Sequence, residues 1–159
     1  MSAGSLVASG IGIFLLVFTA YILIGGALTT TEVMVEAQSN LAAYQEARMR
    51  TAIAIENTTL DGTTLYVRVT NTGSEPVVDL ASIDVYLQSE GVPAYIPHGT
   101  DPYHWSTVKI DPDGIHPDQL DPGETLNLSI GFEGAGPTWV QVVTPNGVSG
   151  SAYIDRPGE

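Results

Sequence analysis

The chain opens with a long apolar run, and the spacing of its hydrophobic positions changes twice after that. Residues 6–28 are almost uniformly apolar and carry no charge. A run of about 23 residues exceeds the roughly 20 helical residues that cross a bilayer core. A cleaved secretory signal has a basic start and an apolar segment of only about 7–15 residues. We therefore predict a retained transmembrane helix within residues 1–31.

We expect the apolar side chains of this helix to face lipid. They are represented along the run by Leu6, Ile11, Phe14, Phe18, Ile24 and Leu28. No Lys or Arg precedes the run, and Arg48 and Arg50 lie near the limit of the distance over which basic residues set topology. Because a short N-terminal tail is easily left in the cytoplasm, we predict a single-pass protein with the rest of the chain outside the cell membrane.

A second helical segment is predicted over residues 32–49. Apolar side chains recur there at steps of three and four, at Val33, Ala37, Leu41 and Tyr44. Either a new helix begins after Thr31, with a kink at Gly25–Gly26, or one helix continues from Leu6 to Arg48. In both cases the segment forms a stalk between the membrane and the next domain.

From residue 50 onward the period shortens to two, which is typical of strands with one buried face. The alternating segments are 53–55, 65–69, 83–87, 126–130, 138–144 and 148–154. Turn sequences such as "NTGSEP", "LDPGE" and "TPNGV" separate them. About six or seven short strands in residues 50–159 predict an all-β, immunoglobulin-like antiparallel sandwich, although the Cys–Trp–Cys pattern of antibody domains is absent.

Residues 91–123 break this pattern, being rich in Pro, Asp and His with one strand-like stretch, "HWSTVKI". We expect constrained loops at one end of the sandwich, where binding surfaces usually lie. Tyr103 and Trp105 are our candidates for an exposed contact with a protein partner, with local packing as the alternative. Trp139 alternates within a predicted strand, so we expect it in the core.

Composition narrows the function classes. The formal net charge is −13, from 18 acidic and 5 basic residues, and such a domain repels nucleic acid. There is no cysteine, which excludes disulfides, thiolate metal sites and a cysteine nucleophile. We predict no nucleic-acid partner; membrane lipid is the expected contact of the apolar helix.

Motifs for chemistry are weak. His98, His104 and His116 match no zinc spacing, and "DPDG" at 111–114 fits a β-turn better than a calcium loop, so weak calcium binding by the acidic loops stays an alternative. No nucleophile elbow or phosphate-binding loop is present. We therefore predict no enzyme, no cofactor and no metal site. Asn57 and Asn127 each begin an N-x-Ser/Thr sequence, a candidate N-glycosylation site.

Three stretches carry a resemblance to a known family. They are "EARMRTAIAIENTTLDGTTLYVRVTNTGSEPV", "LDPGETLNLSIGF" and "VQVVTPNGVSGSAY", in this order after an N-terminal anchor. In them the chain resembles the archaellum stator proteins of the FlaF/FlaG (ArlF/ArlG) family, within the archaeal flagellin and type IV pilin-like group. The closing hairpin is more similar to the FlaF branch.

The resemblance implies a stator component whose helix anchors it in the membrane and whose sandwich lies between membrane and S-layer. The implied partners are the S-layer protein, a FlaG-like protein and the archaellum motor, in a homo- or hetero-oligomer. The alternative is a structural filament subunit, archaellin-like or pilin-like, with the N-terminal helix in the filament core. Archaellins carry a basic leader before the apolar helix, and no Lys or Arg precedes it here, which favours the anchor.

Overall fold

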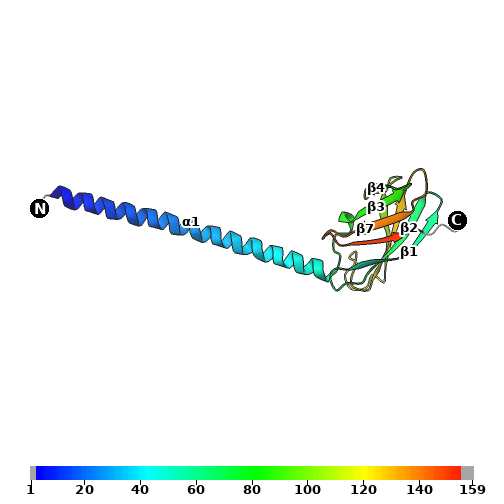
Figure 1. The fold of residues 1–159 in the computed structure, drawn as a ribbon. Helices are drawn as coiled ribbons and strands as arrows, with labels where there is room; N and C mark the ends of the chain where they lie inside the picture. Colours follow the sequence, from blue (N-terminus) through cyan, green and yellow to red (C-terminus); the bar gives the residue numbers. More distant parts are fainter. Residues whose placement is uncertain (1–2, 155–159) are drawn as a thin grey trace. The chain divides into compact units, whose positions relative to one another are not determined.

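The computed structural model describes residues 3–154, except for the side chains of residue 5 and residues 27–32. It contains one long helix, α1 (Ala3–Arg50), followed by a β-sandwich (Figure 1). The chain consists of two compact units, Met1–Ala43 and Tyr44–Glu159. The second unit therefore holds the last turns of α1 together with the sandwich.

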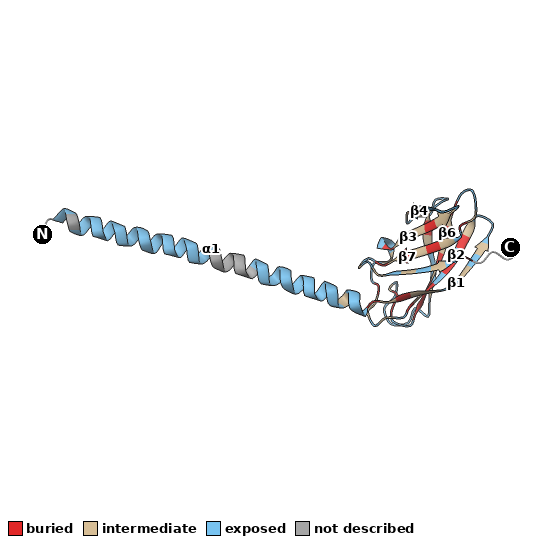
Figure 2. Cartoon of the chain, viewed as in Figure 1, coloured by how far each residue is buried: buried red, intermediate tan, exposed pale blue. Residues whose placement is uncertain are grey.

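α1 is a single helix that passes through residues 31 and 49, where the sequence placed its segment boundaries. Of the two alternatives for the stalk, the structure therefore has the continuous helix. Within it, Leu6–Gly26 is long and apolar enough to cross a membrane, and none of it is buried (Figure 2). Among the proposed lipid-facing residues, Leu6, Ile11, Phe14, Phe18 and Ile24 are each more than half exposed. Leu28 lies among the residues whose side chains are not described.

The sandwich consists of two four-stranded antiparallel sheets. Its strands are β1 (Ile53–Asp61), β2 (Thr64–Asn71), β3 (Asp84–Ser89), β4 (Val92–Ile96), β5 (Trp105–Asp111), β6 (Thr125–Gly131), β7 (Trp139–Val143) and β8 (Ser149–Tyr153), with a short 3-10 helix, η1 (Leu80–Ser82), before β3. One sheet has the order β1-β2-β6-β5 and the other β4-β3-β7-β8. This is the ABED and CFG order of immunoglobulin domains with one added edge strand, so the predicted fold class is confirmed.

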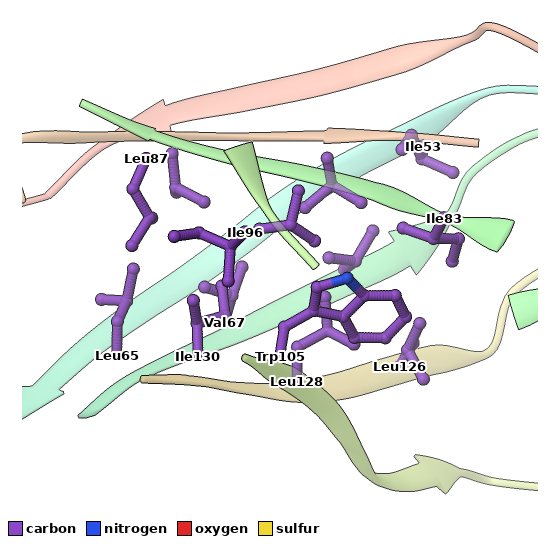
Figure 3. Packing of buried hydrophobic residues seen from close by; sticks show 14 of the residues in the cluster. Ile53, Leu65, Val67, Ile83, Leu87, Ile96, Trp105, Leu126, Leu128 and Ile130 are labelled. Carbon is purple, nitrogen blue, oxygen red and sulfur yellow. The ribbon is translucent and has the colours of Figure 1, made fainter. Parts of the chain in front are cut away.

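The core lies between the sheets and is built by the predicted alternation (Figure 3). The buried positions include Leu65, Val67 and Val69 on β2, Val85 and Leu87 on β3, and Leu126, Leu128 and Ile130 on β6. Residues between them face outward, because successive side chains of a strand point to opposite faces of the sheet. Each sheet therefore has one buried and one outer face.

The sequence underestimated the strands. Residues 91–123 were expected to hold one strand, but they contain β4 as well as β5. β4 was hidden by Pro93, which breaks the alternation. The strand tolerates this proline because β4 is an edge strand, and its free edge needs no N–H donor.

Candidate functional site: an aromatic sheet face and a helix junction

Four aromatic side chains lie on the outer face of the β4-β3-β7-β8 sheet, and we call them the aromatic band. They are Tyr95 on β4, Tyr86 on β3, Trp139 on β7 and Tyr153 on β8. Tyr86 is directly opposite Tyr95, and Trp139 is directly opposite Tyr153. The two pairs are diagonal neighbours, since Gln88 lies opposite Trp139. The band therefore crosses all four strands, one aromatic from each.

The band is accessible. The rings of Tyr86 and Tyr95 are tilted by 56° with centroids 5.5 Å apart. Tyr95 is 53% exposed and Tyr153 is 81% exposed, while Tyr86 and Trp139 are half-buried. Exposed Tyr and Trp side chains on a rigid sheet provide large contact area at low conformational cost, and such residues dominate the binding energy of protein interfaces.

Charge sets this face apart from the rest of the molecule. Among the outward positions of its four strands, the one charged residue is Asp84, although the chain has a net charge of −13. Partial burial and the neighbouring Asp84 carboxylate raise the pKa of Tyr95. The face therefore offers aromatic and amide groups with little electrostatic repulsion toward a partner.

Trp105 is not at the surface, which corrects the expectation that it is a partner contact. Its side chain is completely buried at the start of β5, among Ile83, Ile96 and Leu126 (Figure 3). The His98 ring covers it at a centroid distance of 4.5 Å. Its indole Nε1–H is the one buried side-chain polar atom without a hydrogen-bond partner among the described residues. Trp105 is thus a core residue of the sandwich.

Tyr103 differs from Trp105, although only one residue separates them. Its side chain is 49% exposed, and its φ of 73° is unusual for a bulky residue. The loop is held against β6: a Cβ on Gly131 would lie 2.8 Å from the Tyr103 nitrogen. Tyr103 therefore lies on the loop between β4 and β5 and belongs to no strand of the sheet that carries the aromatic band.

A second notable arrangement joins the last turn of α1 to the sandwich, and we call it the junction. The Thr51 hydroxyl donates to the Ala47 carbonyl at 2.8 Å and accepts from the Asn146 amide at 2.7 Å. The amides of Thr72 and Gly73 both donate to the Ala52 carbonyl. A Cβ on Gly73 would lie 2.4 Å from the Ala52 nitrogen, so only glycine fits there.

Asn71 fixes the strand end that forms the other side of the junction. It is completely buried. Its side-chain amide donates to the carbonyls of Glu75 and Leu120, and its side-chain oxygen accepts from Gly73. The "NTG" turn of the sequence is therefore a structural element that holds the helix end.

Two of the histidines have clear side-chain partners, since the His98 ring packs on Trp105 and the His116 ring lies against Asp121. His116 bonds to the buried Asp121 carboxylate through its backbone N–H and its ring. The hydrogen bond from the His116 side chain holds the pKa of Asp121 below its usual value, against the effect of burial. Across residues 3–154, no three His, Asp or Glu side chains are grouped closely enough to hold a metal ion.

Comparison with solved structures relates the sandwich to archaellum proteins. The chain is similar to the archaellum periplasmic stator protein FlaG from Sulfolobus acidocaldarius, with 22% sequence identity and a TM-score of 0.54, over 65% of this chain and 99% of that one. It is also similar to a chain of the archaellum periplasmic stator protein complex FlaF and FlaG from the same organism, with 21% identity and a TM-score of 0.53, over 64% of this chain and 87% of that one. At these identities the likeness establishes a shared fold. Sequence comparison with protein families and with curated proteins gives no match.

Sequence reasoning missed the aromatic band, because its members lie far apart in the chain. Tyr86 and Trp139 are outward positions of their alternating segments, next to the buried Val85 and Val140. The alternation of "SIDVYLQ" already assigned Tyr86 to the polar face. The same reasoning applied to "TWVQVV", with Val140 and Val142 inward, would have placed Trp139 outside.

Proposed function

We propose that the protein is a non-enzymatic, membrane-anchored component of an archaellum stator. The proposal rests on an apolar helix able to cross a membrane and a sandwich with the fold of the stator protein FlaG. The observation that carries it is the combination of these two parts in one chain, in which the helix that contains the apolar span ends at Arg50 and β1 begins at Ile53. The sandwich would lie outside the cell, between membrane and S-layer.

Two partners are included in the proposal. The first is a FlaF- or FlaG-like protein in a hetero-oligomer, because a similar structure is a complex of FlaF and FlaG. The second is the S-layer protein, which the family resemblance implies. Membership of the FlaF branch in particular stays a prediction.

The aromatic band is our proposed contact with the S-layer. It has the composition of an interface centre, with one Trp and three Tyr residues, and the outward positions of its strands include one charged residue, Asp84, in a chain of net charge −13. Tyr103, on the β4–β5 loop, is retained as a separate candidate contact. Trp105 is excluded because its side chain is buried in the core.

Binding of the full-length chain in detergent to detached S-layer protein tests this proposal. We expect the wild type to bind, and the double variant Tyr86→Ala/Trp139→Ala to bind roughly tenfold or more weakly, as expected for interface hot spots. Tyr66→Ala is the matched control, because Tyr66 is a 43% exposed tyrosine on the outer face of the other sheet. Tyr103→Ala, measured separately, reports on the loop.

The outcomes separate the alternatives. If the wild type does not bind, the proposed S-layer contact is contradicted. If Tyr66→Ala loses as much affinity as the double variant, the assignment of this contact to the aromatic band is contradicted. Electron microscopy of the same detergent preparation addresses the filament-subunit hypothesis. Long filaments of this single chain would support that hypothesis and contradict the stator proposal.

A further inference from the structure

We propose that Asn57 is a site of N-glycosylation and that Asn127, in spite of its matching sequence, is not. The two N-x-Ser/Thr sequences are equivalent as motifs. The structure places them in different surroundings, and those surroundings decide whether a transferase reaches the asparagine. The inference rests on the proposed function in one respect, namely that the sandwich lies outside the cell.

Asn57 lies at an accessible position of the sandwich. It is exposed, and so is Thr59, which lies on the same face of β1 two residues further along. β1 is one of the two edge strands of its sheet and pairs only with β2. Within residues 3–154, neither side chain makes a hydrogen bond to another group. Both groups that the transferase must reach are therefore free.

A break in the strand pairing next to Asn57 adds to this access. Ile55 pairs with Val69, but Asn57 pairs with Arg68, so Glu56 is an extra residue in β1. Such a β-bulge disrupts the ladder locally and bends the strand. Less backbone pairing has to be broken here to present Asn57 to an enzyme than in a regular strand.

Asn127 has the opposite surroundings. β6 is a central strand, hydrogen-bonded to β2 on one side and to β5 on the other. The half-buried Asn127 amide donates to the Lys109 carbonyl at 3.5 Å. The Ser129 hydroxyl, the third position of this motif, is 3.0 Å from the Ser106 hydroxyl. Modification of Asn127 in the folded protein would require a central strand to be displaced.

The surface beside Asn57 also has room for a sugar. A pocket of about 230 Å³ lies next to this residue, lined by Ile55, Glu56, Asn57, Thr58, Ala152 and Tyr153. Tyr153 is 81% exposed. The C–H face of a pyranose packs well on an aromatic ring, because both surfaces are apolar.

The reaction has a definite balance. The Nδ2 nitrogen of Asn57 forms a bond with the anomeric carbon of an oligosaccharide carried by a polyprenyl phosphate lipid. The bond between that carbon and the phosphate oxygen breaks, the lipid phosphate leaves, and one amide proton is released to the transferase. The chain supplies the asparagine and the Thr59 hydroxyl; the transferase and the lipid-linked donor come from the cell.

Mass spectrometry of the full chain tests the proposal. The wild type and the variants Asn57→Gln, Thr59→Ala and Asn127→Gln are purified from membranes of one archaeal host that N-glycosylates exported proteins. We expect a glycan on the Asn57 peptide of the wild type and of Asn127→Gln. We expect it to be lost in Asn57→Gln and also in Thr59→Ala, which keeps the asparagine and removes only the hydroxyl.

Topology is measured in the same cells, so that the two proposals fail separately. The natural chain has no cysteine, and Glu133→Cys, at an exposed position, therefore gives a single label site for a membrane-impermeant maleimide. Labelling without a glycan on Asn57, or with a glycan on Asn127, overturns the glycosylation proposal alone. Absence of labelling in intact cells, with labelling after lysis, overturns the extracellular sandwich and the glycosylation proposal with it.

Discussion

The two tryptophans lie in different environments of the sandwich. Trp105 is completely buried at the start of β5, whereas Trp139, at the start of β7, is half-exposed on an outer face. Both begin a strand, and both follow a loop that contains Pro. Their different roles arise from register: Trp105 lies opposite the buried Ile130, and Trp139 lies opposite the outward Gln88 and Tyr153.

This contrast shows that residue type alone does not tell a core aromatic from a binding aromatic. The position of a tryptophan in its strand decides whether the side chain points into the core or out of the sheet. Inside the sandwich it contributes by excluding water from a packed core, and on the outer face it leaves apolar area for a partner. The following predictions test this division, beginning with the largest expected effect.

Trp105→Ala should have the largest effect on stability. The substitution leaves a large cavity among buried residues, and we expect the free energy of unfolding to fall by about 3–5 kcal/mol. Urea denaturation followed by circular dichroism measures the loss. A loss below about 1 kcal/mol would contradict the central role of Trp105 in the core.

Asn71→Ala tests the polar part of the interior. Removal of the side chain takes one hydrogen bond each from the carbonyls of Glu75 and Leu120 and from the Gly73 amide, and we expect a loss of about 1–3 kcal/mol. The same denaturation experiment applies, with exposed Thr59→Ala as the control. An unchanged midpoint would mean that water replaces all three bonds.

Trp139→Ala should change stability by at most about 1 kcal/mol, because the side chain is on the outer face and removal leaves no internal cavity. The measurement can be sharpened by fluorescence. With Trp105 as the remaining tryptophan, emission should be blue-shifted and resistant to acrylamide. In the reciprocal variant Trp105→Phe, emission from Trp139 should be red-shifted and readily quenched.

The smallest expected effect is on the acid stability of the sandwich, through Asp121 in the loop that precedes β6. The pKa of Asp121 is lowered chiefly by the hydrogen bond from the His116 side chain. The carboxyl of an unfolded chain has a pKa of about 3.9, so it binds a proton more readily than the folded Asp121 carboxyl does. The free energy of unfolding therefore falls as the pH drops from about 5 through the folded pKa. Asp121→Asn should flatten this part of the curve, measured by urea midpoints between pH 6 and 3, and exposed Asp61→Asn should not.

Much of the fold could be predicted from the sequence because the sheets are amphipathic. The alternation in "LYVRV", "SIDVYLQ" and "LNLSI" marked the buried positions of β2, β3 and β6, and the long apolar run marked α1. The strand count was too low because Pro93 hides β4. Trp139 was assigned to the core because it lies in an alternating segment, although that alternation, with Val140 and Val142 inward, places it outside.

The candidate site was less accessible to sequence reasoning. The aromatic band combines residues from 86 to 153, and their proximity depends on the pairing of β3 with both β4 and β7. Trp105 was assigned to the surface because its neighbours are polar and Pro-rich, and the position opposite Ile130 that buries it is set by the pairing of β5 with β6. Such pairings join residues that are far apart in the sequence, so the local pattern of hydrophobic positions does not predict them.

The junction has a mechanical consequence. A swivel requires residues that rotate freely about their backbone bonds, and only Thr51 and Ala52 separate α1 from β1. Thr51 is tied to Ala47 and Asn146, and the Ala52 carbonyl accepts two backbone hydrogen bonds from the turn after β2. The connection is therefore torsionally stiff. A torque on the sandwich is therefore transmitted to the end of α1. Rotation of the sandwich relative to the end of α1 would first require the hydrogen bonds around Thr51 and Ala52 to break.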